Sequence, residues 1–223
     1  MKNLGTLLLL FLFSLSLSAQ EKEEDYTQFM LFPAFADGLV VLKDGTRGSG
    51  LFNYSLLNEK IVFFDEDNNV ITFADPSSVG VVIIGDRIFE NVKKNTFYER
   101  IPIGDNYYYV YWKAKWISNG KDTSHHGARS QSFGAVNYKV ADSGTGTSLR
   151  FKTNDGMDMI PVMDYYLKIK NNFKKFDSAD SLAKLIGNHK DEIKEYAKQE
   201  NIDFKNPDDI NRIMQYISPY INQ

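Results

Sequence analysis

Hydrophobic and polar residues follow two different periods along this chain. Between about residues 39 and 176, short apolar runs rich in Val, Ile, Phe and Tyr are separated by turn residues such as Asp44-Gly45. An Asp-Gly pair is typical of a hairpin turn, because glycine tolerates positive φ. This pattern predicts strands joined by tight turns. The expected strands are 39–42, 51–54, 61–64, 70–73, 79–84, 87–89, 96–101 and 107–117, then 135–140, 148–152, 165–169 and 173–176.

Beyond Phe176 the apolar period changes to 3.6, which predicts helices. Asp177 or Ser178 is a suitable cap for a first helix that ends at Gly187, and Asn188 is a suitable cap for a second. Asn206 followed by Pro207 predicts the start of a third, because proline fits the first turn. One apolar face of this third helix carries Ile210, Ile213, Met214 and Ile217.

Together these patterns predict an α+β protein with an antiparallel, hairpin-rich sheet, arranged as a sandwich or partial barrel and followed by about three C-terminal helices. We expect a lead-in segment at 20–38, a β-rich domain at 39–176, and a helical segment at 177–223 that packs on the β-domain. Residues 118–135 are polar and contain glycine without any period, so we expect a long loop there. A short helix from Met163 is the alternative to the hairpin at 165–176.

The first nineteen residues have the order of a secretory signal peptide. A basic start is followed by an apolar stretch at 7–17 and then by the small residues Ser18 and Ala19. We expect cleavage between Ala19 and Gln20, with the Ser18–Ala19 bond as the alternative. A transmembrane helix needs roughly 20 apolar residues, and this run is shorter. The sequence therefore predicts an exported protein without a membrane-spanning segment in its mature part.

Composition narrows the possible chemistry. The chain has no cysteine, which excludes disulfides, a lipoprotein anchor, cysteine nucleophiles and iron–sulfur clusters. Its 26 basic and 29 acidic residues give a net charge of −3, without a basic stripe. We therefore expect no nucleic-acid partner. A periplasmic, outer-membrane-associated or secreted location fits the leader.

The motifs that resemble known sites are incomplete. Asp65, Asp67 and Asn69 have the spacing of the first calcium-loop ligands, but the glycine and glutamate that complete such a loop are missing. They predict a hairpin tip. His125 and His126 are adjacent, which is unsuitable spacing for one metal site, and 144–147 lacks the lysine of a phosphate-binding loop. We expect no cofactor and no metal.

The most distinctive strand is the one that contains Tyr107, Tyr109 and Tyr111. Strand alternation places these three side chains on one face, opposite Tyr108 and Trp112. Tyrosines in a row combine apolar area with a polar tip, as in a platform for a sugar or peptide. The alternative is that another layer of the protein covers them.

Part of the sequence resembles a family of exported α+β proteins found in Bacteroidota, for which no activity is established. The resemblance consists of Lys43-Asp44-Gly45, Leu51–Tyr54, Ile61–Phe63 and Gly85–Phe89, together with Tyr165–Leu167, Phe173–Phe176 and the helices that follow. It implies a periplasmic or surface location in a two-membrane bacterium. It implies no activity, cofactor or functional residue.

These observations favour a non-enzymatic envelope module that binds a protein or surface component. Two alternatives stay open. One is a small-ligand protein for glycan, lipid or peptide, which uses Tyr107, Tyr109 and Tyr111 or a barrel interior. The other is a hydrolase with a carboxylate or histidine site. The sequence leaves the oligomeric state and the partner open.

Overall fold

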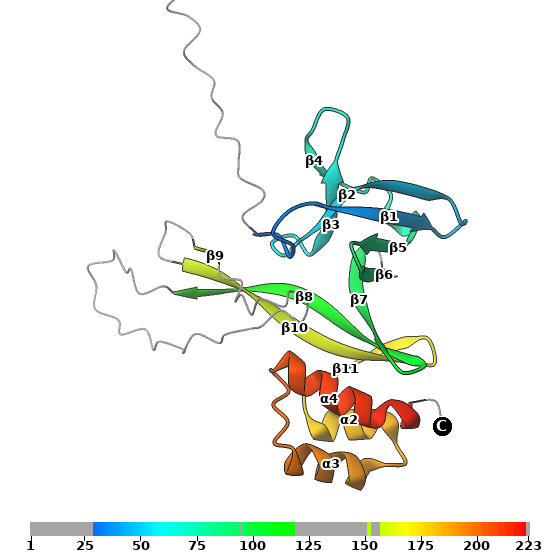
Figure 1. Cartoon of the computed structure of the whole chain (residues 1–223), viewed down its shortest axis with the longest axis vertical. Coiled ribbons are helices and arrows are strands. Elements are labelled where there is room, and N and C mark those ends of the chain that lie inside the picture. The colour runs from blue at the N-terminus through cyan, green and yellow to red at the C-terminus, as the bar shows by residue number, and fades with distance from the viewer. Residues whose placement is uncertain (1–28, 94, 119–150, 153–156, 222–223) are drawn as a thin grey trace, which may run out of the picture.

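The computed structural model describes residues 29–93, 95–118, 151–152 and 157–221 (Figure 1). The β-rich part of the chain forms antiparallel hairpins. The strands are β1 (Ala36–Leu42), β2 (Arg47–Ser55), β3 (Lys60–Phe64), β4 (Val70–Thr72), β5 (Val79–Ile84), β6 (Arg87–Lys93), β7 (Thr96–Ile103), β8 (Asn106–Ser118), β9 (Phe151–Lys152), β10 (Met157–Ile169) and β11 (Asn172–Phe176). The helices are α2 (Ala179–Ile186), α3 (Lys190–Gln199) and α4 (Pro207–Ile217), with single 3₁₀ turns at η2 (Pro76–Ser78) and η3 (Ser218–Tyr220). The predicted leader, nearly all of the 118–135 loop and the predicted strand at 135–140 lie outside the described residues.

The strands form one open antiparallel sheet, and the α+β prediction is confirmed. Its order is β11-β10-β8-β7-β6-β5-β1-β2-β3-β4, with β9 paired to β10. Two four-stranded meanders, β1–β4 and β5–β8, are therefore joined side by side through β1 and β5. The pairing of β8 with β10 then adds the β10–β11 hairpin at the far edge.

Gly38 lies where the two meanders meet. A Cβ atom there would overlap the Ile83 carbonyl oxygen and would lie 2.8 Å from the Phe52 ring. Glycine is required because the backbones of β1 and β5 approach so closely at this point.

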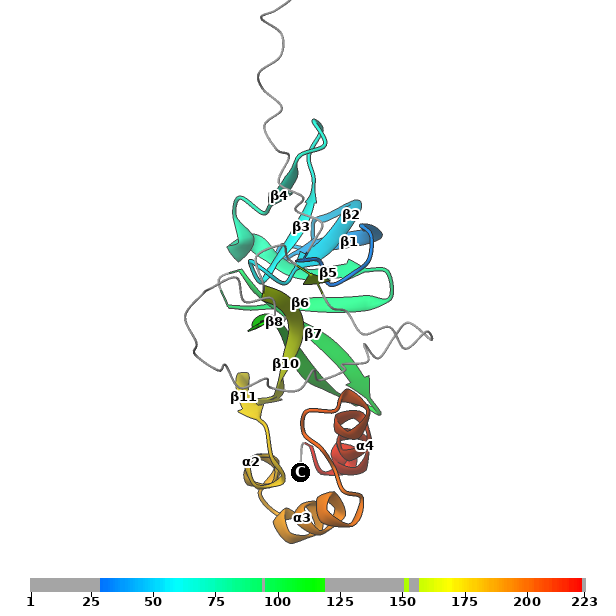
Figure 2. The ribbon, with the colours of Figure 1, turned by 90° about the vertical axis from the view of Figure 1, so that its left-hand side faces the viewer.

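The sheet curls so that the β1–β4 meander lies over one face of β6, β7 and β8 (Figures 1 and 2). Tyr54 on β2 stacks on Phe89 of β6 at 5.7 Å between ring centroids, although two strands separate them in the sheet. The Tyr54 hydroxyl donates a hydrogen bond to the Trp112 carbonyl at 2.9 Å. We call the face enclosed by this curl the inner face, and the opposite one the outer face.

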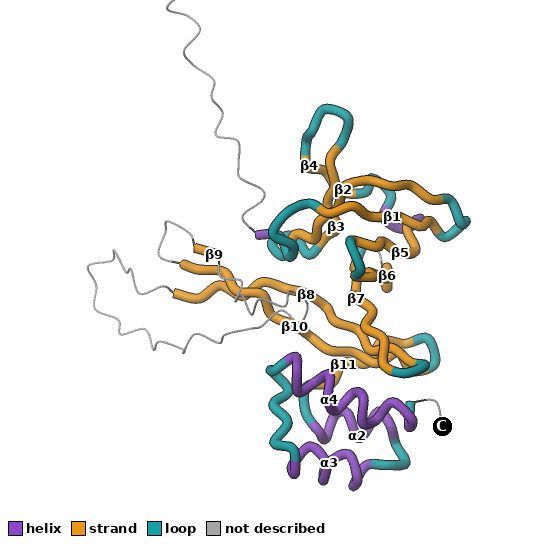
Figure 3. The backbone as a smooth tube through the Cα atoms, viewed as in Figure 1, coloured by secondary structure: helices purple, strands orange, loops and turns teal. Residues whose placement is uncertain are grey.

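The three helices cover the inner face where the curl ends, near β8, β10 and β11 (Figure 3). Ile213 and Ile217 of α4 are fully buried in the same hydrophobic core as Tyr165 and Leu167 of β10. The Ser218 hydroxyl donates to the Ile103 carbonyl at 2.8 Å, which fastens the end of α4 to the β7–β8 turn. The core is therefore continuous from the curled sheet to the helices.

Two of the three predicted helix caps are confirmed. The Ser178 side chain accepts a hydrogen bond from the Ser181 backbone, and Asn206 accepts one from Asp208. Gly187 ends α2 with a φ of 83°. The prediction for Asn188 is wrong: its N–H donates to the Ile186 carbonyl, so it belongs to the turn after α2. His189 takes the cap position of α3 instead, without a side-chain cap bond.

Other local predictions need adjustment at their limits. The first strand begins at Ala36 rather than Leu39, and Leu31 of the lead-in segment is buried in the core. Residues 165–176 form a hairpin, not a helix from Met163. The Asp65 loop is a hairpin tip as predicted, because the Asp65 carboxylate accepts hydrogen bonds from the backbone of Asp67 and Asn69.

Candidate functional site

A buried ion pair lies on the inner face between Arg87 of β6 and Glu99 of β7. Arg87 donates from Nε and from a terminal nitrogen to the two Glu99 oxygens, each at 2.6 Å. Trp112 of β8 donates its indole N–H to the same carboxylate at 2.6 Å. Each charged side chain is only 9% exposed. The Glu99 carboxylate is thus held by three donors from two neighbouring strands.

Aromatic rings enclose the Arg87 guanidinium. Its central carbon lies 4.8 Å from the ring of Phe32, 5.2 Å from Trp112 and 5.6 Å from Phe89. The Asn53 amide places the Phe32 segment here by donating to the Phe32 and Ala34 carbonyls. A cation over aromatic faces is stabilised by the ring quadrupoles, more strongly when it is desolvated. The ion pair is therefore enclosed by the aromatic rings around Arg87 and by the Trp112 indole that bonds Glu99.

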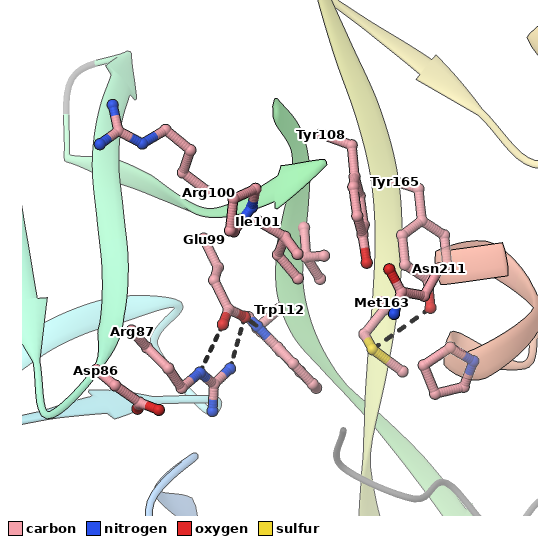
Figure 4. A pocket seen from close by; sticks show the side chains of 13 residues that line it. Asp86, Arg87, Glu99, Arg100, Ile101, Tyr108, Trp112, Met163, Tyr165 and Asn211 are labelled. Carbon is pink, nitrogen blue, oxygen red and sulfur yellow. Dashed lines mark hydrogen bonds and ion pairs between the residues drawn. The ribbon is translucent and has the colours of Figure 1, made fainter. Parts of the chain in front are cut away.

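A crevice of about 200 Å³ opens beside this pair, between the inner face and α4 (Figure 4). Aromatic and apolar side chains from β7, β8 and β10 form much of its walls, charged residues of β6 and β7 and Asp86 line the rest, and Pro207 and Asn211 of α4 lie on one side. The lining side chains that matter below are Glu99, Tyr108, Trp112, Met163, Tyr165 and Asn211.

Tyr108 points into this crevice from β8 (Figure 4). The residue is only 4% exposed, and its hydroxyl has no hydrogen-bond partner among the described residues. Burial, and then the charge of Glu99, raises the pKa of Tyr108, so the hydroxyl stays protonated. By contrast, the Tyr165 hydroxyl donates to the Met163 sulfur at 3.5 Å.

The structure places Tyr107, Tyr109 and Tyr111 on the outer face, each with different neighbours. Tyr107 is 42% exposed and lies against the Arg100 guanidinium at 4.6 Å. Tyr109 is buried although it lies outside the hydrophobic core, and its hydroxyl donates to Glu90 at 3.2 Å. The Tyr111 hydroxyl donates to Glu59, and its ring lies 5.0 Å from Tyr98. The ligand platform made of these three residues stays a prediction.

The outer face also carries aromatic residues that the sequence analysis did not single out. Tyr98 stacks on Tyr166 at 4.6 Å, and Phe173 packs edge-on to both Tyr98 and Tyr109. We call the set Tyr98, Tyr109, Tyr111, Tyr166 and Phe173 the aromatic layer. Strand alternation at 96–101 and 165–169 could have placed Tyr98 and Tyr166 on one face of their strands. Only the pairing of β8 with β10 shows that the two strands contribute to the same face of the sheet.

Charged pairs surround the aromatic layer. Lys168 contacts Glu90 at 2.8 Å, and both Lys113 and Lys175 contact Asp164, at 2.5 and 2.9 Å. Burial opposes ionisation of Asp164, but the hydrogen bonds from these two lysines outweigh it and lower the pKa of the carboxyl. The pairs remain partly exposed, so water screens them.

The buried pair was missed by the sequence analysis, although a signal for it exists. Phe97, Glu99 and Ile101 alternate on one side of β7, which places a carboxylate among apolar residues. A charged residue in an apolar register implies a buried partner.

His125, His126 and 144–147 lie outside the described residues. Among the described residues, no three His, Asp or Glu side chains are grouped as metal ligands would be.

No protein-family model matches this chain, and no curated protein or solved structure matches it either. The described part of the chain contains no helix with both the length and the apolar character that a membrane crossing requires.

Proposed function

We propose that this protein is a non-enzymatic binding module of the bacterial cell envelope, and that the outer face of β7, β8, β10 and β11 contacts a protein partner. The observation that carries this proposal is the aromatic layer, which lies on the face opposite the core and the helices. Tyrosine and arginine are enriched where proteins bind one another, because they combine apolar area with hydrogen bonding. Tyr107 and Arg100 stand together at the border of this face.

The charges on this face favour an acidic partner segment. Arg100, Lys113, Lys168 and Lys175 are basic and Glu59, Glu90 and Asp164 are acidic, so this set carries an excess of one positive charge. The whole chain has a net charge of −3. The face therefore differs in sign from the rest of the protein, and complementary charge favours association and its specificity.

The location of this module follows from the leader. A signal peptide at 1–19, cleaved between Ala19 and Gln20, delivers the chain to the periplasm or the cell surface, and the resemblance to exported proteins of Bacteroidota agrees with that route. Because the chain has no cysteine, a lipid anchor attached to cysteine is excluded.

Site-specific crosslinking in the intact cell tests this proposal. A photoreactive residue at Tyr107 is expected to capture a protein that the same residue at Gln215, which is exposed on α4, does not capture. Neutralising Lys168 and Lys175 to Gln is expected to remove the crosslink, whereas Lys184→Gln with Lys198→Gln on the helices leaves it intact. Equal capture from both positions, or a crosslink that survives the first double substitution, contradicts the proposal.

A further inference from the structure

We infer that the crevice between the inner face and α4 is a binding site for a small, neutral aromatic compound that carries one hydrogen-bonding group. This site lies on the opposite side of the sheet from the proposed protein-binding face, so the two proposals stand or fall separately.

The size and the walls of the crevice favour a single aromatic ring. A dry cavity of about 150 Å³ lined by apolar side chains accepts benzene, and this crevice measures about 200 Å³. Tyr108, Trp112 and Tyr165 contribute three aromatic side chains to the walls. Aromatic rings pair favourably in offset or edge-on arrangements, and the Met163 sulfur adds a favourable contact with a ring edge.

Tyr108 provides the polar anchor. The residue is buried as a whole, and its hydroxyl faces the crevice without a hydrogen-bond partner among the described residues. A hydroxyl that faces a cavity without a protein partner is free to bond a ligand hydroxyl or carbonyl, and this bond would fix the orientation of the ligand. The Asn211 amide of α4 lines the same space and offers both a donor and an acceptor.

The charges beside the crevice favour a neutral ligand. Two basic and two acidic residues line it, Arg87, Arg100, Asp86 and Glu99, and Glu99 already accepts three hydrogen bonds. The lining therefore has no net charge, and a charged ligand would lose its hydration without a net opposite charge to compensate it.

Fluorescence of Trp112 gives a direct test. The chain contains two tryptophans, so Trp116→Phe leaves Trp112, at the crevice wall, as the only reporter. Phenol and benzene are titrated into this variant, with excitation at the red edge of the tryptophan absorption, where neither probe absorbs. Saturable changes in emission are expected with both probes. Adding Tyr108→Phe is expected to weaken phenol binding about fivefold to tenfold and to leave benzene binding unchanged.

Two substitutions on α4 serve as matched controls. Asn211→Trp places a large ring at the crevice and is expected to abolish binding, whereas Gln215→Trp on the exposed side of the same helix leaves it intact. Because both add a tryptophan, binding to them is measured by ligand-observed NMR, and thermal melting verifies that each variant folds. Absence of saturable binding in the folded Trp116→Phe variant overturns the inference. So does an equal loss of phenol and benzene affinity in Tyr108→Phe, or unchanged binding in Asn211→Trp.

Discussion

The inner and outer faces of the sheet combine aromatic rings with oppositely charged pairs, but under different exposure to water. On the inner face, Arg87 and Glu99 are each 9% exposed and lie among Phe32, Phe89 and Trp112. On the outer face, Asp164 is 18% exposed and its partner Lys175 is 45% exposed. Ion pairs of similar length therefore differ in what their loss costs in folding free energy. A buried charge that loses its partner is left without either water or an opposite charge.

The comparison also separates two uses of aromatic side chains. Inner rings such as Tyr54 and Phe89 fill the space enclosed by the curled sheet. Rings of the aromatic layer lie over the backbone of β7, β8 and β10, bordered by charged side chains. The inner rings are enclosed in the core, whereas the rings of the aromatic layer, apart from the buried Tyr109, remain partly exposed.

The largest predicted difference concerns one carboxylate on each face. We expect Glu99→Ala to lower the free energy of unfolding by about 3–5 kcal/mol, because Arg87 is left buried without its partner. Glu90→Ala on the outer face is expected to cost about 1–2 kcal/mol, because its ion pairs are partly exposed while the Tyr109 hydroxyl loses its acceptor. Urea unfolding monitored by circular dichroism measures both values. Equal losses for the two variants would remove the distinction between the faces.

Replacing both members of the inner pair tests whether the loss comes from the unpaired charge. The Arg87→Met, Glu99→Leu double variant is expected to lie within about 2 kcal/mol of the wild type, since apolar residues of similar size substitute well for buried ion pairs. The unpaired Trp112 N–H accounts for most of the remaining cost. A double variant as unstable as Glu99→Ala would contradict this account.

A smaller effect is expected when one tyrosine hydroxyl is removed from each face. Tyr54→Phe is expected to cost about 1 kcal/mol, because it deletes the buried hydrogen bond to the Trp112 carbonyl. Tyr111→Phe is expected to change the free energy of unfolding by no more than about 0.5 kcal/mol, because water can replace the lost bond at this half-exposed position. Thermal melting of the two variants provides the comparison, and a larger loss for Tyr111→Phe would reverse it.

The smallest effect is a dependence on pH at the outer face. The pKa of Asp164 is lowered in the folded protein from its ordinary value of 3.8. Its stabilising contribution is therefore present at neutral pH and lost as pH falls below about 4, through the folded pKa. The wild type is expected to exceed Asp164→Asn by less than about 1 kcal/mol at pH 7. The difference should vanish in acid, and a constant or growing gap would refute the assignment.

Local structure was largely predictable from this sequence, because local signals determine it. Ser178, Gly187 and Asn206 carry their cap signals within a few residues, and the Asp44-Gly45 turn does the same for the first hairpin. The error at Asn188 arose because a good cap residue lies one position before a histidine that stacks on Tyr220 at 4.0 Å. The ring contact involves a residue about thirty positions away, which no local pattern describes.

The arrangement of the sheet and the buried pair required information that strand patterns do not contain. Alternation identified Tyr107, Tyr109 and Tyr111 as one face, but it does not specify which strands lie beside β8. Glu99 was detectable as a carboxylate in an apolar register, whereas Arg87 was not identifiable as its partner without the pairing of β6 with β7. The crevice depends in addition on where α4 lies, and this position depends on long-range packing.

Gly38, at the junction of the two meanders, has a consequence for the order of folding. Hairpin pairs within each meander are close in sequence and form early, whereas the β1–β5 contact closes a loop that spans β2, β3 and β4. We therefore expect docking of one meander on the other to be the slow step. A methyl group at position 38 would obstruct that docking, so Gly38→Ala is expected to slow refolding while the separate hairpins still assemble.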